Sequence, residues 1–494
     1  MQQLDFWITK RASQTPHKTA LIQIETGEAW TYEQLMQHAN GWSTIFQKGQ
    51  FQKGDRIAVL MENSIRNFAI LFACRMNGLI YVPLNHKLSS AELTVVLADC
   101  TPVQLICDEV QEQRAKQLMK SAMLVGESKP EKNFAYEWRD EPNLPWLMIY
   151  TGGTTGKSKG VVLSYGAVTT NAINTIISWG LHDRDCTLNY MPLFHTGGIN
   201  ALSLPLLLAG GTVVIGQKFD PERAIRALDE YKTTISLFVP TMYQLMTETE
   251  YFQQSSFPTV KVFLSGGAPC PKPIYDRFKK RGLLFKEGYG LTEAGPNNFV
   301  IDAEVAMVKK GTIGKGMLFN EVQLINENGE PCVQGEVGEL CLKGNHVFLK
   351  YWNNEEETKK AFHNGWLKTG DLARVDEDGD FYIVGRKKEM IITGGENVYP
   401  QEVEQCLLAE PAVDEVSVIG IPDEKWGECI VAFVVSKQQT LDLEQTLKLL
   451  CKERLANYKV PKQFYFIEDL PKTVVGKIDK KRLAEIAKEN IRIH

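Results

Sequence analysis

The sequence lacks several features that would indicate other classes of protein. Its ten cysteines include no CxxC pair, so neither a zinc site nor a thioredoxin-like redox motif is predicted. A chain of 494 residues can bury sizeable cores without disulfides, and reduced cytosolic thiols are therefore expected. There is no basic tail, and the net charge of −5 gives no electrostatic reason to expect nucleic-acid binding.

The sequence predicts neither a signal peptide nor a membrane span. Residues 1–11 carry charges early and contain no apolar core, so no signal peptide is expected. The most apolar stretch, residues 201–215, contains Pro205 and Gly210 and is too short to span a bilayer. We expect a buried helix followed by a strand there, and a soluble cytoplasmic protein with no membrane span.

What the sequence does contain is an alternation of short β-branched runs with amphipathic stretches. This pattern predicts an α/β fold with mostly parallel sheets in a large N-terminal domain of several subdomains. The length also favours two or more domains. The clearest predicted buried strands are residues 56–60, 81–84, 211–215, 235–239 and 260–264.

The pattern changes after Asp371. An acidic turn at residues 375–379 and a strand at residues 380–384 lead into a smaller set of helices and strands. Pro400 stands where the first residue of a helix would. The predicted domains are residues 1–387 and a small α+β domain at residues 388–494.

The densest cluster of glycine, threonine and lysine is TGGTTGKSKG at residues 151–160, between two predicted strands. Glycines allow backbone N–H groups to approach phosphate oxygens, while hydroxyls and lysines add donors and positive charge. A Walker A loop needs glycine five residues before Gly156, where this chain has Thr151. A plain surface hairpin is the alternative. The candidate triphosphate-binding residues are Thr151, Gly152, Gly153, Thr154, Thr155, Gly156, Lys157 and Lys159.

This segment closely resembles the signature loop of the adenylate-forming enzymes, which include acyl-CoA synthetases, nonribosomal-peptide adenylation domains and beetle luciferases. The family usually has serine where this chain has Gly152 and proline where it has Ser158. The first departure removes a hydroxyl near the phosphates. Further motifs resemble the family's, in the same order, along nearly the whole chain. The resemblance implies the adenylate-forming enzyme fold.

Two of these motifs lie in the middle of the chain. Residues 192–198 (PLFHTGG) resemble the family's aromatic-histidine motif, which implies that His195 borders the carboxylate pocket and takes part in catalysis. A structural histidine is the alternative. Residues 265–269 (SGGAP) are similar to the adenine-side loop, and on their own are equally compatible with a tight turn. The implied nucleotide contacts are Gly266, Gly267 and Ala268.

The segment EGYGLTE at residues 287–293 is highly specific. The resemblance implies that Tyr289 stacks on adenine and that Thr292 contacts phosphate and carboxylate oxygens. It also implies that Glu293 binds Mg²⁺, with Thr154 as a second ligand. Mg²⁺ takes one or two carboxylates together with phosphate oxygens, which agrees with this assignment. The implied nucleotide contacts are Glu287, Gly288, Tyr289, Gly290 and Thr292, and Thr292 and Glu293 are also implied in catalysis.

Residues 366–371 (WLKTGD) resemble the family's ribose motif. The resemblance implies that Asp371 accepts hydrogen bonds from the ribose hydroxyls and that Arg386 supports the ribose or a phosphate. Ile383, on the strand between them, is also implied in nucleotide binding. A turn role for Asp371 is the alternative.

The C-terminal domain resembles the family at three further points. Lys388 matches the hinge about which this domain rotates. Gly394 and Gly395 belong to a segment similar to the loop that enters the active site for the second half-reaction, where they would leave room for a pantetheine arm. Residues 471–478 (PKTVVGKI) match the C-terminal lysine motif, which makes Lys477 the implied catalytic lysine.

The resemblance implies an AMP-forming carboxylic acid:CoA ligase that works through an acyl-adenylate. Its implied cofactors and partners are ATP, Mg²⁺, coenzyme A and a small carboxylic acid. Small and aromatic residues at 238–243, 266–269 and 294–297 are the candidate acid pocket and favour a fatty or aromatic acid. An o-succinylbenzoyl-CoA synthetase of menaquinone synthesis is a serious alternative.

Other classes remain open at this stage. A P-loop NTPase or kinase would release ADP, and the missing Walker spacing disfavours it. A catalytically weak nucleotide-binding relative would bind ATP without activating any acid. The final acceptor is CoA or a carrier protein, and no carrier domain follows Lys477 before the chain ends at His494. A homodimer is a further alternative that no motif decides.

Overall fold

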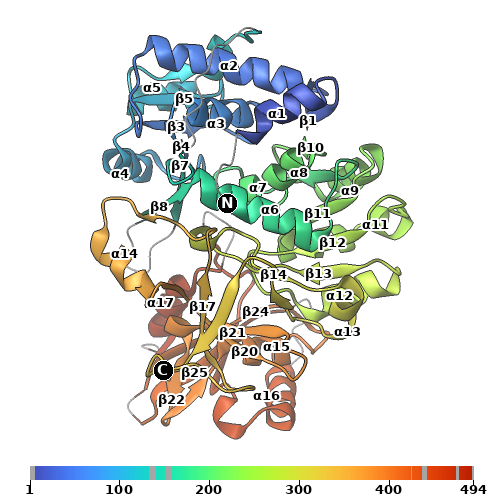
Figure 1. Cartoon of the computed structure of the whole chain (residues 1–494). Helices are drawn as coiled ribbons and strands as arrows, with labels where there is room; N and C mark the ends of the chain where they lie inside the picture. The colour runs from blue at the N-terminus through green and yellow to red at the C-terminus, as the bar shows by residue number, and fades with distance from the viewer. Residues whose placement is uncertain are drawn as a thin grey trace.

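The computed structural model describes residues 6–132, 141–151, 158–423, 425–436, 442–473 and 478–491. In Figure 1 the chain passes from the N-terminal elements at the top to a smaller C-terminal domain at the bottom. Within the described ranges, no helix is long and apolar enough to cross a membrane.

The helices of the larger domain cover its sheets. In chain order they are α1 (Trp7–Gln14), α2 (Tyr32–Lys48), α3 (Arg66–Met76), α4 (Ser90–Cys100), α5 (Glu112–Leu118), α6 (Tyr165–Trp179), α7 (Thr196–Asn200), α8 (Ser203–Ala209), α9 (Pro221–Glu230), α10 (Pro240–Thr247), α11 (Glu250–Gln254), α12 (Lys272–Lys280), α13 (Ala303–Val308) and α14 (Glu355–Ala361).

Two seven-stranded sheets form the larger domain. The first has the order β13 (Phe285–Glu287), β12 (Val262–Ser265), β11 (Ile235–Phe238), β9 (Cys186–Asn189), β10 (Thr212–Ile215), β1 (Thr19–Gln23) and β2 (Ala29–Thr31). The second has the order β18 (Lys350–Tyr351), β8 (Lys159–Ser164), β7 (Pro145–Thr151), β4 (Ile80–Pro83), β3 (Arg56–Leu60), β5 (Gln104–Cys107) and β6 (Met123–Leu124).

Most neighbours in these sheets are parallel, as the alternating pattern predicts. The antiparallel pairs lie at the sheet ends: β2 with β1, β8 with β7, and β18 with β8. The five strands predicted from β-branched runs are β3, β4, β10, β11 and β12, each displaced by no more than a few residues. The apolar stretch at residues 201–215 forms α8 and then β10, as expected.

Helix α6 lies beside both large sheets, and its ends follow from local chemistry. The Ser164 side chain accepts a hydrogen bond from the Ala167 N–H and caps the first turn. Gly180 ends the helix with φ +65°, a conformation that glycine adopts without strain. The buried residues of α6 contribute to the largest hydrophobic core, which also contains Trp146 and Phe72.

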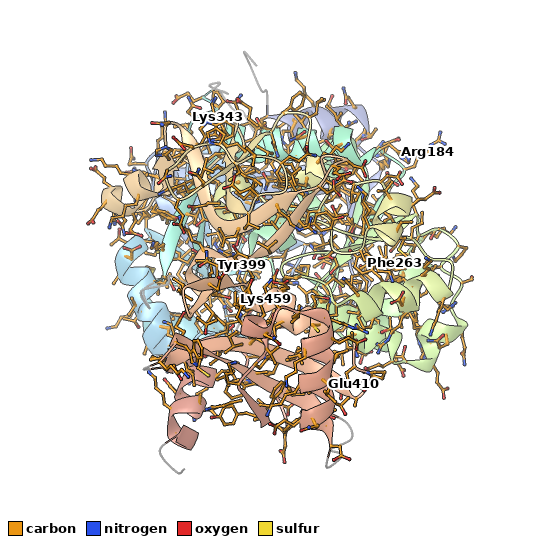
Figure 2. All side chains as sticks on the ribbon, turned by 90° about the horizontal axis from the view of Figure 1, so that it is seen from below. Arg184, Phe263, Lys343, Tyr399, Glu410 and Lys459 are labelled. Atoms are coloured by element: carbon orange, nitrogen blue, oxygen red, sulfur yellow. The ribbon has the colours of Figure 1, made fainter. Side chains whose placement is uncertain are left out.

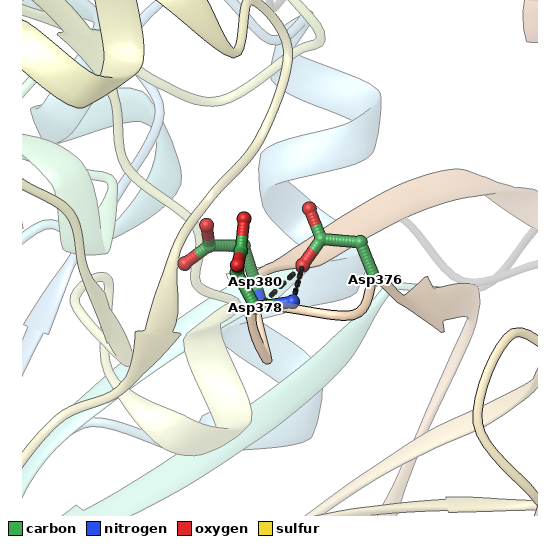
Figure 3. A group of neighbouring side chains, drawn as sticks. All are labelled: Asp376, Asp378 and Asp380. Carbon is green, nitrogen blue, oxygen red and sulfur yellow. Dashed lines mark hydrogen bonds between the residues drawn. The ribbon is translucent and has the colours of Figure 1, made fainter.

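A third, antiparallel sheet completes the larger domain before the predicted boundary at residue 387. Its strands are β16 (Glu321–Ile325), β17 (Gly338–Lys343), β20 (Trp366–Val375), β19 (Phe362–His363) and β21 (Phe381–Arg386), and a separate two-stranded sheet contains β14 (Phe299–Val300) and β15 (Lys315–Gly316). The predicted acidic turn joins β20 to β21. There Asp376 Oδ1 accepts hydrogen bonds from the N–H groups of Asp378 and Asp380, at 3.0 and 2.9 Å (Figure 3).

The C-terminal domain is a sheet with helices on both faces. Its strands are β23 (Glu396–Val398), β22 (Ile391–Thr393), β25 (Gly427–Ser436), β24 (Val413–Asp423) and β26 (Gln463–Phe466). Helices α15 (Pro400–Leu407) and α16 (Leu443–Arg454) pack on one face, and α17 (Lys480–Ile491) packs on the other. Alternate residues of β25 supply the two cores. Pro400 is the first residue of α15, as predicted. Figure 2 views the molecule from below and labels Tyr399, Glu410 and Lys459 of this domain.

The described hydrophobic clusters do not mix residues of the two domains. The cores of the larger domain extend no further than Ile383, and the cores of the smaller one begin at Ile391. Residues 387–389 between them form a short 3-10 turn. The domain boundary at residue 387 stays a prediction, and the separation of the hydrophobic cores supports it.

Candidate active site

Two predicted nucleotide loops leave the same edge of the first sheet. Strands β12 and β13 are parallel, with Ser265 opposite Glu287, so Gly266 and Gly288 both follow a carboxyl end. The Gly288 N–H donates to the Ser265 carbonyl at 2.8 Å. A Cβ on Gly290 would lie 2.2 Å from the Pro296 backbone, so only glycine fits there. Carboxyl ends of parallel strands are the usual ligand-binding edge of α/β sheets.

Glu287 supports the first of these loops from inside the fold. Its Oε2 accepts from the Cys270 N–H at 2.9 Å, and its Oε1 accepts from the Tyr275 hydroxyl at 2.7 Å. Burial raises the pKa of Glu287 to about 7, against the lowering effect of these two hydrogen bonds. The side chain therefore has protein partners that the sequence did not predict, and its nucleotide contact stays a prediction. No spacing rule could have indicated Tyr275 as its partner.

Two predicted residues from other motifs, Tyr289 and Arg386, contact Asp371. The Tyr289 hydroxyl donates to Asp371 Oδ2 at 2.5 Å, and Arg386 Nε lies 2.6 Å from Asp371 Oδ1. Asp371 and Arg386 are opposite each other on β20 and β21. Burial, followed by the negative charge of Asp371, raises the pKa of Tyr289 well above its usual value, so the phenol stays protonated. Asp371 is a buried strand residue, so the alternative of a turn role is wrong.

The remaining nucleotide-side residues frame this cluster. Gly266 is buried at the end of β12, while Gly267 and Ala268 are exposed. Ile383 lies opposite Ala373 in the β20–β21 ladder and is half-buried against the largest core. Their contacts with a nucleotide stay predictions.

The turn that contains Thr292 and Glu293 is anchored by a segment that the sequence did not indicate. Residues 292–294 form a 3-10 turn in which both side chains are half-buried. The Glu293 carbonyl accepts from the Phe348 N–H at 2.7 Å, and Glu293 Oε1 accepts from the Tyr351 hydroxyl at 2.8 Å. A half-buried carboxylate with one oxygen already oriented is suited to hold Mg²⁺.

The glycine-rich segment is described only at its ends. Thr151 pairs with Lys159 and Tyr150 with Gly160, so β7 and β8 run antiparallel from the loop. The Lys159 ammonium forms an ion pair with Glu357 and lies 5.1 Å from the centroid of the Tyr351 ring. The predicted residues outside the described ranges are Gly152, Gly153, Thr154, Thr155, Gly156 and Lys157.

His195 lies between a tight turn and the first residue of α7. It is the N-cap residue of that helix and is half-buried, with its ring 4.6 Å from the Phe194 ring. Phe194 in turn packs edge-on against His86. A Cβ on Gly198 would lie 2.3 Å from the Pro192 carbonyl oxygen, so the turn requires glycine. The predicted catalytic role of His195 stays a prediction.

The glycine pair of the smaller domain forms the turn between β22 and β23. Gly394 and Gly395 have φ values of +60° and +84°, which suit a two-residue hairpin turn. The Gly394 N–H donates to the Trp426 carbonyl at 2.8 Å, and a Cβ there would lie 3.1 Å from the Trp426 ring. That ring is 42% exposed and has the ammonium groups of Lys425 and Lys462 at 4.9 and 6.0 Å from its centroid.

The hinge and the catalytic lysine are less fully defined. Lys388 is exposed on the 3-10 turn between the domains. Lys477 lies outside the described residues, although Lys472 and Ile478 on either side of it form a bridge. Both roles stay predictions.

Two aromatic residues of the predicted acid pocket belong to the core instead. Phe238 and Tyr243 are fully buried in the hydrophobic cluster under the first sheet. The Tyr243 hydroxyl donates to the Leu264 carbonyl at 2.8 Å. Aromatic content alone could not separate pocket from core, and the prediction for these two side chains is corrected.

One acidic group among the described residues could by composition hold a metal ion: Asp376, Asp378 and Asp380. It lies on the β20–β21 turn (Figure 3). The Lys309 ammonium lies 3.0, 2.6 and 2.6 Å from one oxygen of each carboxylate in that order. This ammonium occupies the place that a cation would take among the three carboxylates, which leaves Glu293 as the described metal-ligand candidate beside the nucleotide loops.

Comparison with known proteins decides the family. Residues 8–352 match the AMP-binding enzyme family, and residues 402–477 match the AMP-binding enzyme C-terminal domain. The chain belongs to the AMP-binding enzyme family. The predicted boundary at residue 387 lies in the interval between the two matched segments.

Relatives that match this AMP-binding enzyme over nearly their whole length are named CoA synthases or CoA ligases. It is 37% identical over 484 residues to a feruloyl-CoA synthase of Amycolatopsis sp, covering 97% of each chain. It is 34% identical over 496 residues to an indoleacetate–CoA ligase of Aromatoleum aromaticum, again covering 97% of each. The structure of o-succinylbenzoate CoA synthetase from Bacillus subtilis with ATP and magnesium matches with a TM-score of 0.87, at 31% identity and covering 97% and 98%.

These likenesses confirm the predicted class. The adenylate-forming fold, the larger α/β domain with its smaller C-terminal domain, and an AMP-forming acid–thiol ligase are what the sequence predicts and what the relatives share. ATP, Mg²⁺ and CoA are the cofactors of this class. The alternative of a P-loop NTPase is thereby excluded.

Proposed function

We propose that this AMP-binding enzyme activates an aromatic carboxylic acid with ATP and transfers the acyl group to CoA. The cluster of Tyr289, Asp371 and Arg386 beside the Gly266 loop carries the proposal, because it unites three separate motifs at one ligand-binding edge. The names of the relatives support the acid class, since ferulate, indoleacetate and succinylbenzoate are all aromatic acids.

In this proposal the nucleotide is held at the edge of the first sheet. Asp371 accepts from the ribose hydroxyls while Tyr289 and Arg386 fix its orientation. The loop at Gly266 to Ala268 receives the adenine. The site uses hydrogen bonds and a buried charge, both of which are stronger away from bulk water.

The first half-reaction is attack of the carboxylate on the α-phosphate, with pyrophosphate leaving. Glu293 would hold Mg²⁺, which supplies positive charge to the phosphate oxygens. Lys159 and Lys477 add positive charge, and Thr292 donates a hydrogen bond. His195 borders the acid pocket. A protein accelerates this kind of reaction mainly by aligning the reacting groups and by neutralising the developing negative charge.

In the second half-reaction the CoA thiol attacks the acyl-adenylate and releases AMP. We propose that rotation of the C-terminal domain about Lys388 removes Lys477 and brings in the hairpin at Gly394 and Gly395. The exposed Trp426 ring with Lys425 and Lys462 beside it supports a CoA-binding role, since aromatic rings stack on adenine and lysines attract phosphate.

An exchange screen tests the reaction and the acid class. Acid-dependent exchange of pyrophosphate into ATP would be measured with aromatic, fatty and small aliphatic acids. We expect the highest rate with an aromatic acid and AMP as the product. Exchange confined to fatty acids would contradict the acid class, and no exchange with any acid despite ATP binding would favour a catalytically weak relative.

o-Succinylbenzoate is a second specific candidate. Solved o-succinylbenzoate CoA synthetases match the chain at TM-scores of 0.86 to 0.88. The same screen separates it from ferulate-like and indole acids, because only o-succinylbenzoate carries a second carboxylate. Thioester formation with free CoA would test whether the final acceptor is CoA or a carrier protein.

Lys477→Ala separates the two half-reactions. We expect loss of acyl-adenylate formation, on the order of 100-fold or more, with transfer from preformed adenylate to CoA retained. Each half-reaction would be followed separately. Equal loss in both would contradict the proposed division of labour.

A cytoplasmic location and a homodimer are also proposed. All ten cysteines are unpaired, which suits a reducing compartment where ATP and CoA are made. Light scattering of the purified chain tests the dimer.

A further inference from the structure

One short segment contacts both phosphate-side motifs of the site. This segment, residues 348–357, runs from Phe348 through β18 into α14. Its Phe348 N–H donates to the Glu293 carbonyl at 2.7 Å, and its Trp352 N–H donates to the Gly160 carbonyl at 2.7 Å. Strand β18 also pairs with β8, which follows the glycine-rich segment. The segment therefore links the Glu293 turn to the strand that leaves the phosphate loop.

The Tyr351 side chain extends this link to the functional groups. Its hydroxyl donates to Glu293 Oε1 at 2.8 Å. A phenol hydroxyl is a hydrogen-bond donor to a carboxylate in this arrangement. One oxygen of Glu293 is thereby oriented by a fixed partner.

Lys159 is held by the same segment. Its ammonium lies 5.1 Å from the centroid of the Tyr351 ring and forms an ion pair with Glu357 Oε2. The lysine side chain is only 18% exposed, so its position is restricted. The hydrogen bond from Lys159 is the main cause of the lowered pKa of Glu357.

Local hydrogen bonds fix Glu357 relative to Tyr351. The Asn354 side chain accepts from the Glu357 N–H at 3.0 Å and caps α14. The Tyr351 N–H donates to the Thr358 hydroxyl at 3.0 Å. The ring and the carboxylate that flank Lys159 therefore belong to one hydrogen-bonded turn.

We propose that Tyr351 is a positioning residue that couples Glu293 to Lys159: its hydroxyl orients the carboxylate for Mg²⁺, and its ring, together with Glu357, sets the lysine ammonium for the phosphates. The inference rests on the proposed function for the roles of Glu293 and Lys159. It adds two residues outside every motif of the sequence, and it makes the metal site and the phosphate loop interdependent.

The test separates the hydroxyl from the ring by binding measurements on the full chain. Tyr351→Phe keeps the ring over Lys159 and removes the hydroxyl. We expect the Mg²⁺ concentration needed for half-maximal ATP binding, measured by calorimetry, to rise about tenfold, because an oriented charge-assisted hydrogen bond is lost. AMP binding without metal should stay within about twofold, since AMP does not need Glu293. Tyr465→Phe is the matched control, because it loses a hydroxyl that donates to Gln463 far from this segment.

The second arm addresses Lys159. Glu357→Gln should weaken ATP binding about threefold to tenfold at saturating Mg²⁺ without changing the Mg²⁺ midpoint. Tyr351→Leu should show both effects, because it removes hydroxyl and ring. A double-mutant cycle of Lys159→Met with Glu357→Gln should be strongly non-additive.

Two results would overturn the inference. One is an unchanged Mg²⁺ midpoint in Tyr351→Phe, whatever its melting temperature, since that describes a residue with only a structural role. The other is a fall in AMP binding equal to the fall in Mg²⁺–ATP binding. Failure of the wild type to exchange pyrophosphate with any acid would contradict the proposed reaction instead, because these binding readouts need no acid.

Discussion

Two of the chain's Gly-Gly dipeptides, at residues 266–267 and 394–395, have opposite surroundings. Gly266 and Gly267 follow a parallel strand of the larger domain, in a loop that the buried Glu287 carboxylate supports through the Cys270 N–H. Gly394 and Gly395 form an exposed hairpin turn of the smaller domain, with one backbone hydrogen bond to Trp426. The first loop is fixed by buried polar groups, and the second is fixed mainly by its own turn geometry.

This difference matches the two tasks proposed for the domains. A nucleotide loop gains from preorganisation, because groups held in place need no ordering when ATP binds. A hairpin that enters the site only for the second half-reaction must be able to leave, so few contacts and an exposed surface suit it. The same dipeptide thus serves in a supported loop and in an exposed hairpin, which have different physical requirements.

The largest expected effect is at the buried side of this comparison. Asp371→Asn removes the charge next to Arg386 and an acceptor for the Tyr289 hydroxyl. We expect pyrophosphate exchange to fall about 100- to 1000-fold, because a preorganised charged contact to the nucleotide is lost. Asp378→Asn makes the same chemical change on the exposed turn of the same hairpin and should alter the rate less than about twofold. Similar losses in both variants would remove the distinction between buried and exposed carboxylates.

Sequence predicted the strands and the order of motifs well, because β-branched runs and glycine clusters are local signals. It could not predict the partners of Glu287 or Tyr351. The Tyr351–Glu293 contact spans 58 residues, and the fold alone brings the two together. The acid pocket was misassigned at Phe238 and Tyr243, because an aromatic side chain has the same composition in a core as in a pocket. Lys477 and most of the glycine-rich loop lie outside the described residues and stay predictions.

The second effect comes from protonation of the buried polar groups. Burial raises the pKa of Glu287 from 4.5 to about 7 and lowers the pKa of the buried His346 from 6.5 to about 4. The stability that neutral Glu287 contributes is full below pH 4.5 and is lost as the pH rises through 7. The stability that neutral His346 contributes is present above pH 6.5 and is lost as the pH falls through 4. The two contributions oppose each other over an overlapping range.

Substitutions by glutamine, which does not titrate, separate these contributions. Relative to the wild type, Glu287→Gln should gain stability as the pH rises from 4.5 to 7. His346→Gln should lose stability relative to the wild type as the pH rises from 4 to 6.5. Each change is at most about 3 kcal/mol, because a pKa difference of one corresponds to about 1.4 kcal/mol. Urea unfolding at several pH values measures the differences. Curves parallel to the wild type would mean that burial does not shift the pKa of the residue that was replaced.

The third effect is on the exposed side. Trp426→Ala removes the ring beside Gly394, which also lies near the Lys425 and Lys462 ammonium groups. We expect the KM for CoA to rise about tenfold, the usual scale for losing one stacked base, while pyrophosphate exchange stays unchanged. Leu449→Ala, an exposed apolar residue on α16, is the control. A fall in exchange with an unchanged KM for CoA would place Trp426 in the first half-reaction.

The smallest effect tests the two glycine pairs directly. Gly267 and Gly395 share φ +84°, and a Cβ would meet nothing closer than 3.6 Å at the first and nothing within 4 Å at the second. Alanine at either position therefore introduces the same backbone strain, about 1 kcal/mol, without a steric clash. Urea unfolding should show similar losses of stability for both variants.

Equal strain with unequal function is the informative outcome. Gly267→Ala should raise the KM for ATP severalfold in pyrophosphate exchange, because its loop is held against β13 and cannot relax away from the adenine. Gly395→Ala should leave exchange unchanged and slow only transfer to CoA. If both variants impaired the same half-reaction, the two loops would serve one conformation of the enzyme, and the division of tasks between a supported loop and an exposed hairpin would be wrong.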